Sequence, residues 1–257
     1  MTLADSHCHL HMLGSPLPDV LARAREAGVS RFLVPGTTVA DSRDAVRLAQ
    51  EHEEVLAAVG VHPHEAKDFD AERDGPGLEE LARAPGVAAI GEIGLDFHYD
   101  LSPRARQIET LEWMLDLARR LELPVILHNR ESSEEMLALV GRFGPRENAG
   151  VFHSFTANAD FGRKAIDLGY VVSFSGMITF RKAENIREAA AALPLETMLV
   201  ETDSPYLSPE PHRGKPCEPA FVVETARRLA QVKSVDLSDV EDRTTAAFDR
   251  LFVRRGA

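Results

Sequence analysis

Cysteine, tryptophan and long apolar runs are scarce in this sequence. Its 257 residues include 2 cysteines, Cys8 and Cys217, and 1 tryptophan. Two thiols exclude a disulfide-stapled scaffold and a four-cysteine zinc site. No apolar run approaches the roughly 18 residues that a transmembrane helix requires, and no basic segment followed by an apolar one marks a secretory signal. We therefore expect a soluble, cytoplasmic protein with no membrane partner.

Positive charge is also in short supply. Lysine and arginine together number 29 against 41 aspartates and glutamates, so the formal net charge is −12. This acidic balance argues against a general nucleic-acid coat or a membrane-surface binder. It leaves open an enzyme that grips a phosphate locally, because exposed charges more than about 10 Å apart are largely screened at cellular salt. The hydrophobic fraction of 44% is ordinary for a folded protein and excludes overall disorder.

Short apolar runs bounded by glycine or proline alternate with helical patterns along the whole chain. Such runs are typical of buried parallel strands. Helices are expected at 17–28, 102–123 and 132–144 and twice more near the carboxyl end, with Ser102 as the N-cap of the second and Pro103 at its first helical position. The expected strands cover residues 3–9, 31–36, 55–60, 87–94, 124–128, 150–155, 170–175 and 197–203.

Eight strands that alternate with helices predict an α/β fold, a single (β/α)8 TIM barrel over residues 1–257. A doubly wound open sheet is the alternative, because alternation alone does not show that the sheet closes. A length of about 250 residues is typical of one such barrel, and no linker or low-complexity tract marks a domain boundary. We expect a monomer.

Metal-type side chains stand at the carboxyl ends of five expected strands. His7 and His9 are two residues apart, so both imidazoles lie on one face of a strand and Cys8 lies on the other. A barrel gathers its strand ends on one face, where catalytic residues collect. We therefore expect a metal site on that face. The other candidate ligands are Glu92, His128, His153 and Asp203.

The number of candidate ligands predicts two ions. Four imidazoles and two carboxylates exceed the four-ligand shell of a single zinc ion. A carboxylate can bridge two ions about 3.5 to 4 Å apart, and Glu92 is the natural bridge by chain order. The mixed ligands suit Zn, Mn, Fe or Co, and Mg more weakly. Such a site predicts hydrolysis by metal-activated water at a phosphoester or carbonyl centre.

Further polar side chains are candidates for holding a substrate or supporting the ligands. Arg213 and Lys215 make a small cationic patch on a glycine- and proline-rich loop, which suits a phosphate. Glu201 shares the face of Asp203, so it has either a buried structural role or the role of fixing the tautomer of a ligating imidazole. The predicted substrate contacts are His62, Arg130, Arg213 and Lys215.

Taken together, these motifs resemble the TatD-type family of metal-dependent deoxyribonucleases, within the broader amidohydrolase-like barrels. The resembling segments follow the family order over nearly the whole chain, and residues 200–219 are the most specific of them. They include DSHCHL, GVHPH, GEIGLDFHYD, PVILHNRES, FHSFTA and VETDSPYLSPEPHRGKPCEP.

The resemblance implies a ligand set and an activity. Asp203 would handle the proton of the attacking water, which makes it a catalytic residue together with Glu92, and His62 would contact the scissile phosphate. The implied activity is exonucleolytic cleavage of DNA from the 3′ end with two Zn, Mn or Mg ions. His11 departs from the family, which often has Asp there. The implied ligands are His7, His9, Glu92 and Asp203 for one ion and Glu92, His128 and His153 for the other.

Two other classes of function stay open. The same centre would serve a carbonyl hydrolase, for example a deacylase of D-aminoacyl-tRNA esters. The usual bridge of binuclear amidohydrolases is a carboxylated lysine at the end of the fourth strand, and Glu92 stands at that place. This substitution disfavours such enzymes without settling the substrate. The remaining class is a metal-binding adaptor without turnover.

Overall fold

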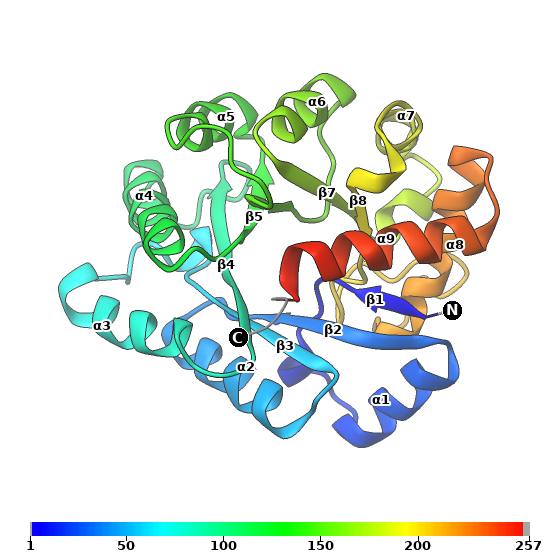
Figure 1. Cartoon of the computed structure of the whole chain (residues 1–257), viewed down its shortest axis with the longest axis horizontal. Helices are drawn as coiled ribbons and strands as arrows, with labels where there is room; N and C mark the ends of the chain where they lie inside the picture. Colours follow the sequence, from blue (N-terminus) through cyan, green and yellow to red (C-terminus); the bar gives the residue numbers. More distant parts are fainter. Residues whose placement is uncertain (1, 254–257) are drawn as a thin grey trace. The chain divides into compact units, whose positions relative to one another are not determined.

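The computed structural model describes residues 2–253, which form two compact units (Figure 1). Of the described residues, unit 1 takes in 2–34, 153–166 and 171–253, and unit 2 takes in Pro35–Phe152 and Asp167–Tyr170. The strands follow one another in chain order from β1 to β8 in one eight-stranded sheet. Within the described residues, no helix combines the length and the apolar character needed to cross a membrane.

Unit 1 carries the first and the last strands of the chain. β1 pairs in parallel with β2, and β7 pairs in parallel with β8. The strands are β1 (Leu3–Asp5), β2 (Val29–Pro35), β7 (Tyr170–Phe174) and β8 (Met198–Val200). The α-helices are α1 (Leu17–Glu26), α6 (Ala159–Asp167), α7 (Glu184–Ala192), α8 (Val222–Lys233) and α9 (Leu237–Phe252). The 3-10 turns are η1 (Leu10–Met12), η3 (Gly176–Thr179), η4 (Leu195–Thr197) and η5 (Pro219–Phe221).

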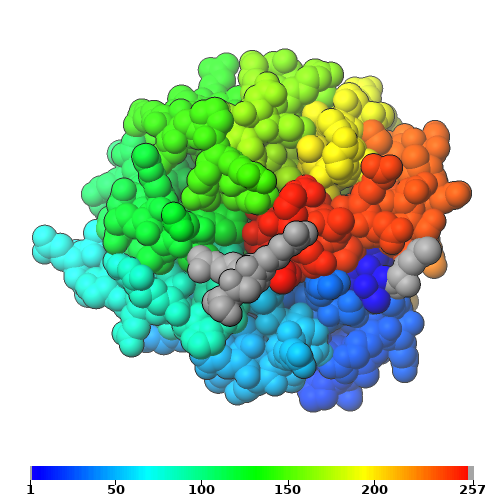
Figure 2. Space-filling view, in the orientation of Figure 1, coloured from blue at the N-terminus to red at the C-terminus, as the bar shows by residue number. Residues whose placement is uncertain are grey.

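The last helix, α9, packs back onto the first strand. Its apolar residues recur at gaps of three and four, and Val240, Phe248 and Leu251 are among those buried. This stripe faces β1 and β8, while α8 lies along the side of α9 (Figure 1). In Figure 2 the red surface of α9 adjoins the orange surface of α8. The pairing ties the two ends of the chain into one hydrophobic core.

Unit 2 contains the middle strands, each paired in parallel with the next. Ile90, Ile93 and Leu127 are fully buried between the strands and their helices. The strands are β3 (Val55–Val59), β4 (Val87–Asp96), β5 (Val125–Arg130) and β6 (Gly150–Phe152). The helices are α2 (Val39–Glu51), α3 (Ala71–Ala82), α4 (Arg104–Leu121) and α5 (Ser133–Gly141), with a 3-10 turn η2 (Pro63–Glu65).

Three strands are shorter than the sequence predicts. β1, β6 and β8 each end after three residues, whereas runs to residues 9, 155 and 203 were expected. Ser154 has φ +42° and Asp203 has φ +58°, which is the left-handed region and not an extended conformation. The chain therefore leaves the sheet just where the polar residues of the motifs begin.

The predicted N-cap of α4 is also wrong. Pro103 occupies the N-cap position, no side chain caps the helix, and the helix begins at Arg104. The Ser102 hydroxyl instead donates to the carbonyl oxygen of His64 at 2.6 Å and accepts the N–H of Lys67 at 3.1 Å. Ser102 thus fixes the loop that carries His64, because a long-range partner outcompetes the local capping role.

The backbones of β4 and β5 lie unusually close together near Glu92, at positions where β4 has glycine. The register between the two strands shifts between Ile90 and Ile93, a bulge of the kind that re-aims a side chain. β4 continues to Asp96, so Glu92 lies inside a strand and not at its end. A Cβ atom on Gly94, whose φ is +148°, would stand 2.0 Å from the carbonyl oxygen of His128. Only glycine fits there without moving the backbone of β5.

Gly94→Ala is therefore expected to lower the free energy of unfolding by about 3 kcal/mol or more, because it combines backbone strain with overpacking. Chemical denaturation followed by circular dichroism measures the change. Gly141→Ala is the matched control: no atom lies within 4 Å of a Cβ at this helical position, so the variant should gain up to about 1 kcal/mol. Equal stabilities for the two variants would contradict the close approach of β4 and β5.

Candidate metal centre

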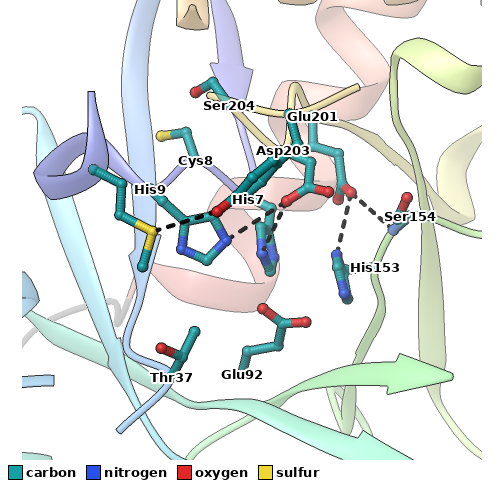
Figure 3. Close-up of polar contacts among 12 residues, drawn as sticks. His7, Cys8, His9, Thr37, Glu92, His153, Ser154, Glu201, Asp203 and Ser204 are labelled. Carbon is teal, nitrogen blue, oxygen red and sulfur yellow. Dashed lines mark hydrogen bonds and ion pairs between the residues drawn. The ribbon is translucent and has the colours of Figure 1, made fainter. Parts of the chain in front are cut away.

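In unit 1, two histidines and an aspartate converge beyond the ends of β1 and β8 (Figure 3). The Nε2 atoms of His7 and His9 lie 3.8 and 3.6 Å from Oδ1 of Asp203. The His7 ring stacks on the His153 ring with centroids 4.0 Å apart. His7 is fully buried, and His9 and His153 are nearly so. The structure thus brings four of the predicted ligands together in this unit.

Backbone hydrogen bonds between the two chain segments set this arrangement. The N–H of Asp203 donates to the carbonyl oxygen of His7, and the N–H of His9 donates to that of Ser204, both at 2.8 Å. A short bridge between Cys8 and Ser204 belongs to the same ladder. The segment after β8 is therefore held in register against the segment after β1. Asp203 sits in this ladder with φ +58°, a conformation that is uncommon for non-glycine residues and that recurs at turns and at functional sites.

Cys8 lies between two candidate ligands but faces away from them. It is completely buried, and its Sγ atom lies 3.7 Å from the carbonyl oxygen of Leu33. Figure 3 shows its side chain directed away from the imidazoles of His7 and His9. This agrees with the two-residue alternation expected from the sequence, which puts Cys8 on the packed face.

Glu201 stands behind the imidazole of His153. Its Oε1 atom lies 3.3 Å from Nδ1 of His153 and accepts the N–H of Ser154 at 2.8 Å (Figure 3). Glu201 is fully buried, and within the described residues its Oε2 atom has no hydrogen-bond partner. A carboxylate at Nδ1 leaves Nε2 of His153 as the ligand atom. Of the two roles expected for Glu201, this geometry favours the orienting one.

The charge of Asp203 is fixed by its surroundings. Burial alone would raise the pKa of its carboxyl group, but the hydrogen bond from His9 and the neighbouring His7 and His153 hold that pKa below its usual value. Asp203 is therefore ionised at neutral pH. An ionised carboxylate can ligate a cation and can accept a proton.

Unit 2 contains a second cluster, made of His62, Glu92 and His128. Oε1 of Glu92 lies 3.0 Å from Nδ1 of His128 and 3.3 Å from Nε2 of His62. His128 lies in β5, and His62 lies just beyond β3 as the N-cap of η2. Parallel strands present their carboxyl ends at one edge, which explains why these residues meet. Glu92 is almost completely buried, so its charge needs these polar neighbours.

Asp96 is a site residue that the sequence did not predict. It is fully buried at the end of β4, with Oδ2 at 3.2 Å from Nε2 of His128 and 2.9 Å from Nε2 of His64. Burial would raise the pKa of Asp96, but bonds from His128, the Tyr99 N–H and His64 hold it well below the usual range. Asp96 stands behind His128 as Glu201 stands behind His153. The two-residue spacing from Glu92 through Gly94 to Asp96 was the signal in the sequence.

A backbone hydrogen bond determines which ring nitrogen of His62 carries the proton. Its Nδ1 atom accepts the N–H of His64 at 3.1 Å, so the proton of the neutral ring is on Nε2. Burial lowers the pKa of His62 to about 4, so the ring is neutral at physiological pH. A ring with no free lone pair at Nδ1 and a proton on Nε2 is a hydrogen-bond donor. The geometry favours that role over metal ligation for His62.

Both clusters have the chemistry and spacing of divalent metal sites, although in unit 2 only Glu92 and His128 are favoured as ligands. In each, the potential ligand atoms all lie within 4.8 Å of one another. Two ligands of a tetrahedral zinc ion at 2.0 to 2.1 Å are about 3.3 Å apart. The 3.6 and 3.8 Å distances of unit 1 need only small side-chain shifts to reach that value. Buried imidazoles backed by carboxylates are the usual surroundings of such ions.

The other predicted contacts are exposed, Arg130 at the end of β5 and Arg213 and Lys215 in the loop after β8. The Arg130 guanidinium lies 4.6 Å above the ring of Tyr99, and that of Arg213 lies 3.9 Å above the ring of Phe180. Arg213 also donates to the carbonyl oxygen of Ser208 at 2.9 Å, and Lys215 is exposed. Tyr99 is 54% exposed and was missed by the sequence reasoning, because a tyrosine in a turn carries no distinctive signal.

Comparison with known proteins identifies the family. A family model described as TatD related DNase matches residues 4–253. The chain belongs to the TatD family. It is 40% identical to the uncharacterized metal-dependent hydrolase YcfH of Escherichia coli K12, over 98% of this chain and 96% of that protein. It is 34% identical to a protein of Erwinia tasmaniensis named 3′-5′ ssDNA/RNA exonuclease TatD, over 91% of this chain and 92% of that one.

The crystal structure of the TatD homologue YjjV from Escherichia coli K12 matches with a TM-score of 0.90 and 28% identity, over 98% of each chain. The predicted (β/α)8 barrel is confirmed, and the open sheet is not the fold. This TatD family member is a metal-dependent hydrolase, as predicted, which leaves the non-catalytic adaptor without support. The single domain, the assignment of each ligand, and the number and identity of the ions stay predictions.

The carboxylates behind the imidazoles provide a test of these assignments. Glu201→Gln and Asp96→Asn should each weaken the affinity for Zn²⁺ or Mn²⁺ by about 10- to 100-fold, because an amide orients the imidazole poorly and makes it less basic. Calorimetric titration of the metal-free protein measures the affinity.

Glu131→Gln is the matched control, because Glu131 pairs with His98 at 2.7 Å on the surface and His98 belongs to neither cluster. If Glu201→Gln and Asp96→Asn bound metal as tightly as this control, neither His153 nor His128 would be a ligand.

Proposed function

We propose that this TatD family member is a metal-dependent deoxyribonuclease that removes nucleotides from the 3′ end of single-stranded DNA. The observation that carries the proposal is an exposed aromatic side chain beside the ligand cluster of unit 2. Tyr99 lies 5.7 Å from the ring of His64, which lies 4.4 Å from His62 and 6.3 Å from His128. A nucleobase stacked on Tyr99 would bring its phosphate toward that cluster.

The guanidinium of Arg130 strengthens this platform for nucleic acid. It lies over one face of the exposed Tyr99 ring, so the positive charge is held next to the place where a base stacks. Stacked arginine and tyrosine are typical of proteins that bind single strands, because every base has a π-face and every linkage has a charged phosphate. A small acyl substrate needs neither feature. The printed name of the Erwinia tasmaniensis relative supports the same substrate class.

Divalent ions held by His7, His9 and Asp203 and by Glu92, His128 and His153 would polarise the phosphate and lower the pKa of water. Asp203, ionised at neutral pH, accepts the proton released as water adds to phosphorus. The Nε2–H of the neutral His62 ring lies 3.3 Å from Oε1 of Glu92 and would turn to a non-bridging phosphate oxygen when the substrate binds. The phosphate charges of the bound DNA are neutralised by Arg130, Arg213 and Lys215.

The reaction is tested with a 5′-labelled single-stranded oligonucleotide whose products are identified by mass spectrometry. The metal-loaded protein should release mononucleotides successively from the 3′ end, and EDTA should stop the reaction. Glu92→Ala should lower the rate at least about 100-fold, more than the loss of an orienting group costs, while Glu131→Ala retains it. Intact DNA together with hydrolysis of a D-aminoacyl-tRNA ester would replace the nuclease with the deacylase.

The stacking platform is tested separately. Tyr99→Ala should raise the KM for single-stranded DNA by about 5- to 150-fold, equivalent to the 1 to 3 kcal/mol of one stacked base, and Tyr99→Phe should restore most of the loss. Leu101→Ala is the control, because Leu101 is also 54% exposed but has no π-face. A KM for Tyr99→Ala equal to that of the Leu101 variant would remove Tyr99 from substrate binding.

A further inference from the structure

Unit 1 contains a cavity rich in arginine, away from the metal ligands. Its volume is about 420 Å³, within the range of small-ligand sites. It lies between the segment around η3 and one face of α8, which pack against each other. The charged residues that line it are Arg181, Arg187, Arg227, Arg228, Glu210 and Glu224. Four cations against two anions stand out in a chain whose net charge is −12.

The arginines of the cavity differ in the hydrogen bonds and ion pairs that they already form. Arg187 donates to the carbonyl oxygens of Ile178 and Phe180, so it holds the turn around η3 in place. Arg227 pairs with Glu224 at 2.7 Å. Arg228 donates through Nη1 to the neutral Gln231 at 2.8 Å, and within the described residues its buried Nε atom has no hydrogen-bond partner. Within the described residues no carboxylate pairs with Arg181 or Arg228, so an anion in the cavity would supply their missing counter-charge.

The cavity is continuous with the loop that follows Asp203. The N–H of Glu210 donates to Oγ1 of Thr179 at 2.9 Å, and the guanidinium of Arg213 stacks on Phe180, which also lines the cavity. The contact is tight, because a Cβ atom on Gly176 would stand 2.2 Å from the carbonyl oxygen of Leu207. Asp203 and Glu210 are seven residues apart, so their Cα atoms lie within about 25 Å. A single strand of a few nucleotides can span that distance.

We infer that this cavity binds a backbone phosphate of the DNA strand, several nucleotides away from the linkage that is cleaved. The inference deepens the proposed function and rests on it. The planar fork of a guanidinium matches a phosphodiester and forms paired, charge-assisted hydrogen bonds. We assign Arg181 and Arg228 to the phosphate. Arg213 lies in the loop after Asp203 and extends the positive charge from the cavity toward that aspartate. These positively charged side chains allow the protein to bind DNA although its net charge is negative.

Binding of dT20 is the test, with a 5′ fluorescent label and phosphorothioate linkages at the 3′ end to slow its hydrolysis. Fluorescence anisotropy gives the Kd of the metal-loaded full chain at a series of salt concentrations. The double variant Arg181→Ala/Arg228→Ala should raise the Kd about 10-fold or more. The slope of log Kd against log salt should fall by about 0.7, because the variant loses one phosphate contact and each such contact on a single strand contributes about 0.7.

Arg163→Ala/Arg243→Ala is the matched control, since it removes the same charge from exposed positions on α6 and α9 of the same unit. It should bind dT20 like the wild type, and both double variants should bind dT2 equally, because a dinucleotide does not reach the cavity. A Kd and slope for the cavity variant equal to those of the control would overturn the inference. An equal loss for dT2 and dT20 would overturn it as well.

The two proposals fail separately. If wild-type protein binds dT20 through Arg181 and Arg228 but leaves unprotected DNA intact, the nuclease assignment is wrong and the phosphate site stands. If wild-type protein degrades DNA while the cavity variant binds dT20 like the control, the phosphate site is wrong and the nuclease assignment stands.

Discussion

The buried carboxyl group of Asp5 joins the two chain segments that carry His7, His9 and Asp203. It accepts the N–H of Thr202 at 2.9 Å and the hydroxyl of Thr202 at 2.6 Å, and it also accepts the N–H of His7 at 3.3 Å. Burial raises the pKa of Asp5 to about 8, although the bonds from Thr202 oppose that rise. Thr202 immediately precedes Asp203, so any movement at Asp5 displaces ligands on both segments at once.

Both units contain a buried carboxylate next to the imidazole of a candidate ligand. Glu201 faces His153 in unit 1, and Asp96 faces His128 in unit 2. Burying carboxylates is expensive unless positive charge and hydrogen bonds compensate. Divalent ions on the far side of the imidazoles would supply that charge. The donor sets, and not the apolar core, are therefore the part of the fold whose stability should depend most on bound metal.

The sequence predicts the barrel well because its information is local. The apolar runs and the helical stripes follow from periodicity, and the ligands follow from polar residues near strand ends. Ser102 was mispredicted because its partners, His64 and Lys67, are more than thirty residues away along the chain. The early ends of β1, β6 and β8 were missed for a similar reason. Aspartate and serine adopt the left-handed conformation only when their surroundings impose it, as at Asp203 and Ser154.

The residues behind the ligands divide in the same way. Glu201 was accessible to sequence reasoning because it alternates with Asp203. Asp96 alternates with Glu92 in the same way, but its contact with His64 depends on the path of the loop after β3, and its contact with His128 depends on the pairing of β4 with β5. The arginine cavity has no motif at all, because Arg181 and Arg228 are separated by more than forty residues and meet only through the packing of α8 on η3.

The orientation of Cys8 has a consequence for which elements the centre can accept. A thiolate between two histidines would make a soft donor set that traps Cu(I) or other thiophilic ions. The side chain of Cys8 packs against Leu33 on the opposite face. Its sulfur is therefore not a donor to the metal centre, and the candidate ligand atoms of the described residues are nitrogen and oxygen. The alternation of side chains along His7–His9, just beyond β1, therefore favours borderline or hard cations over thiophilic ones.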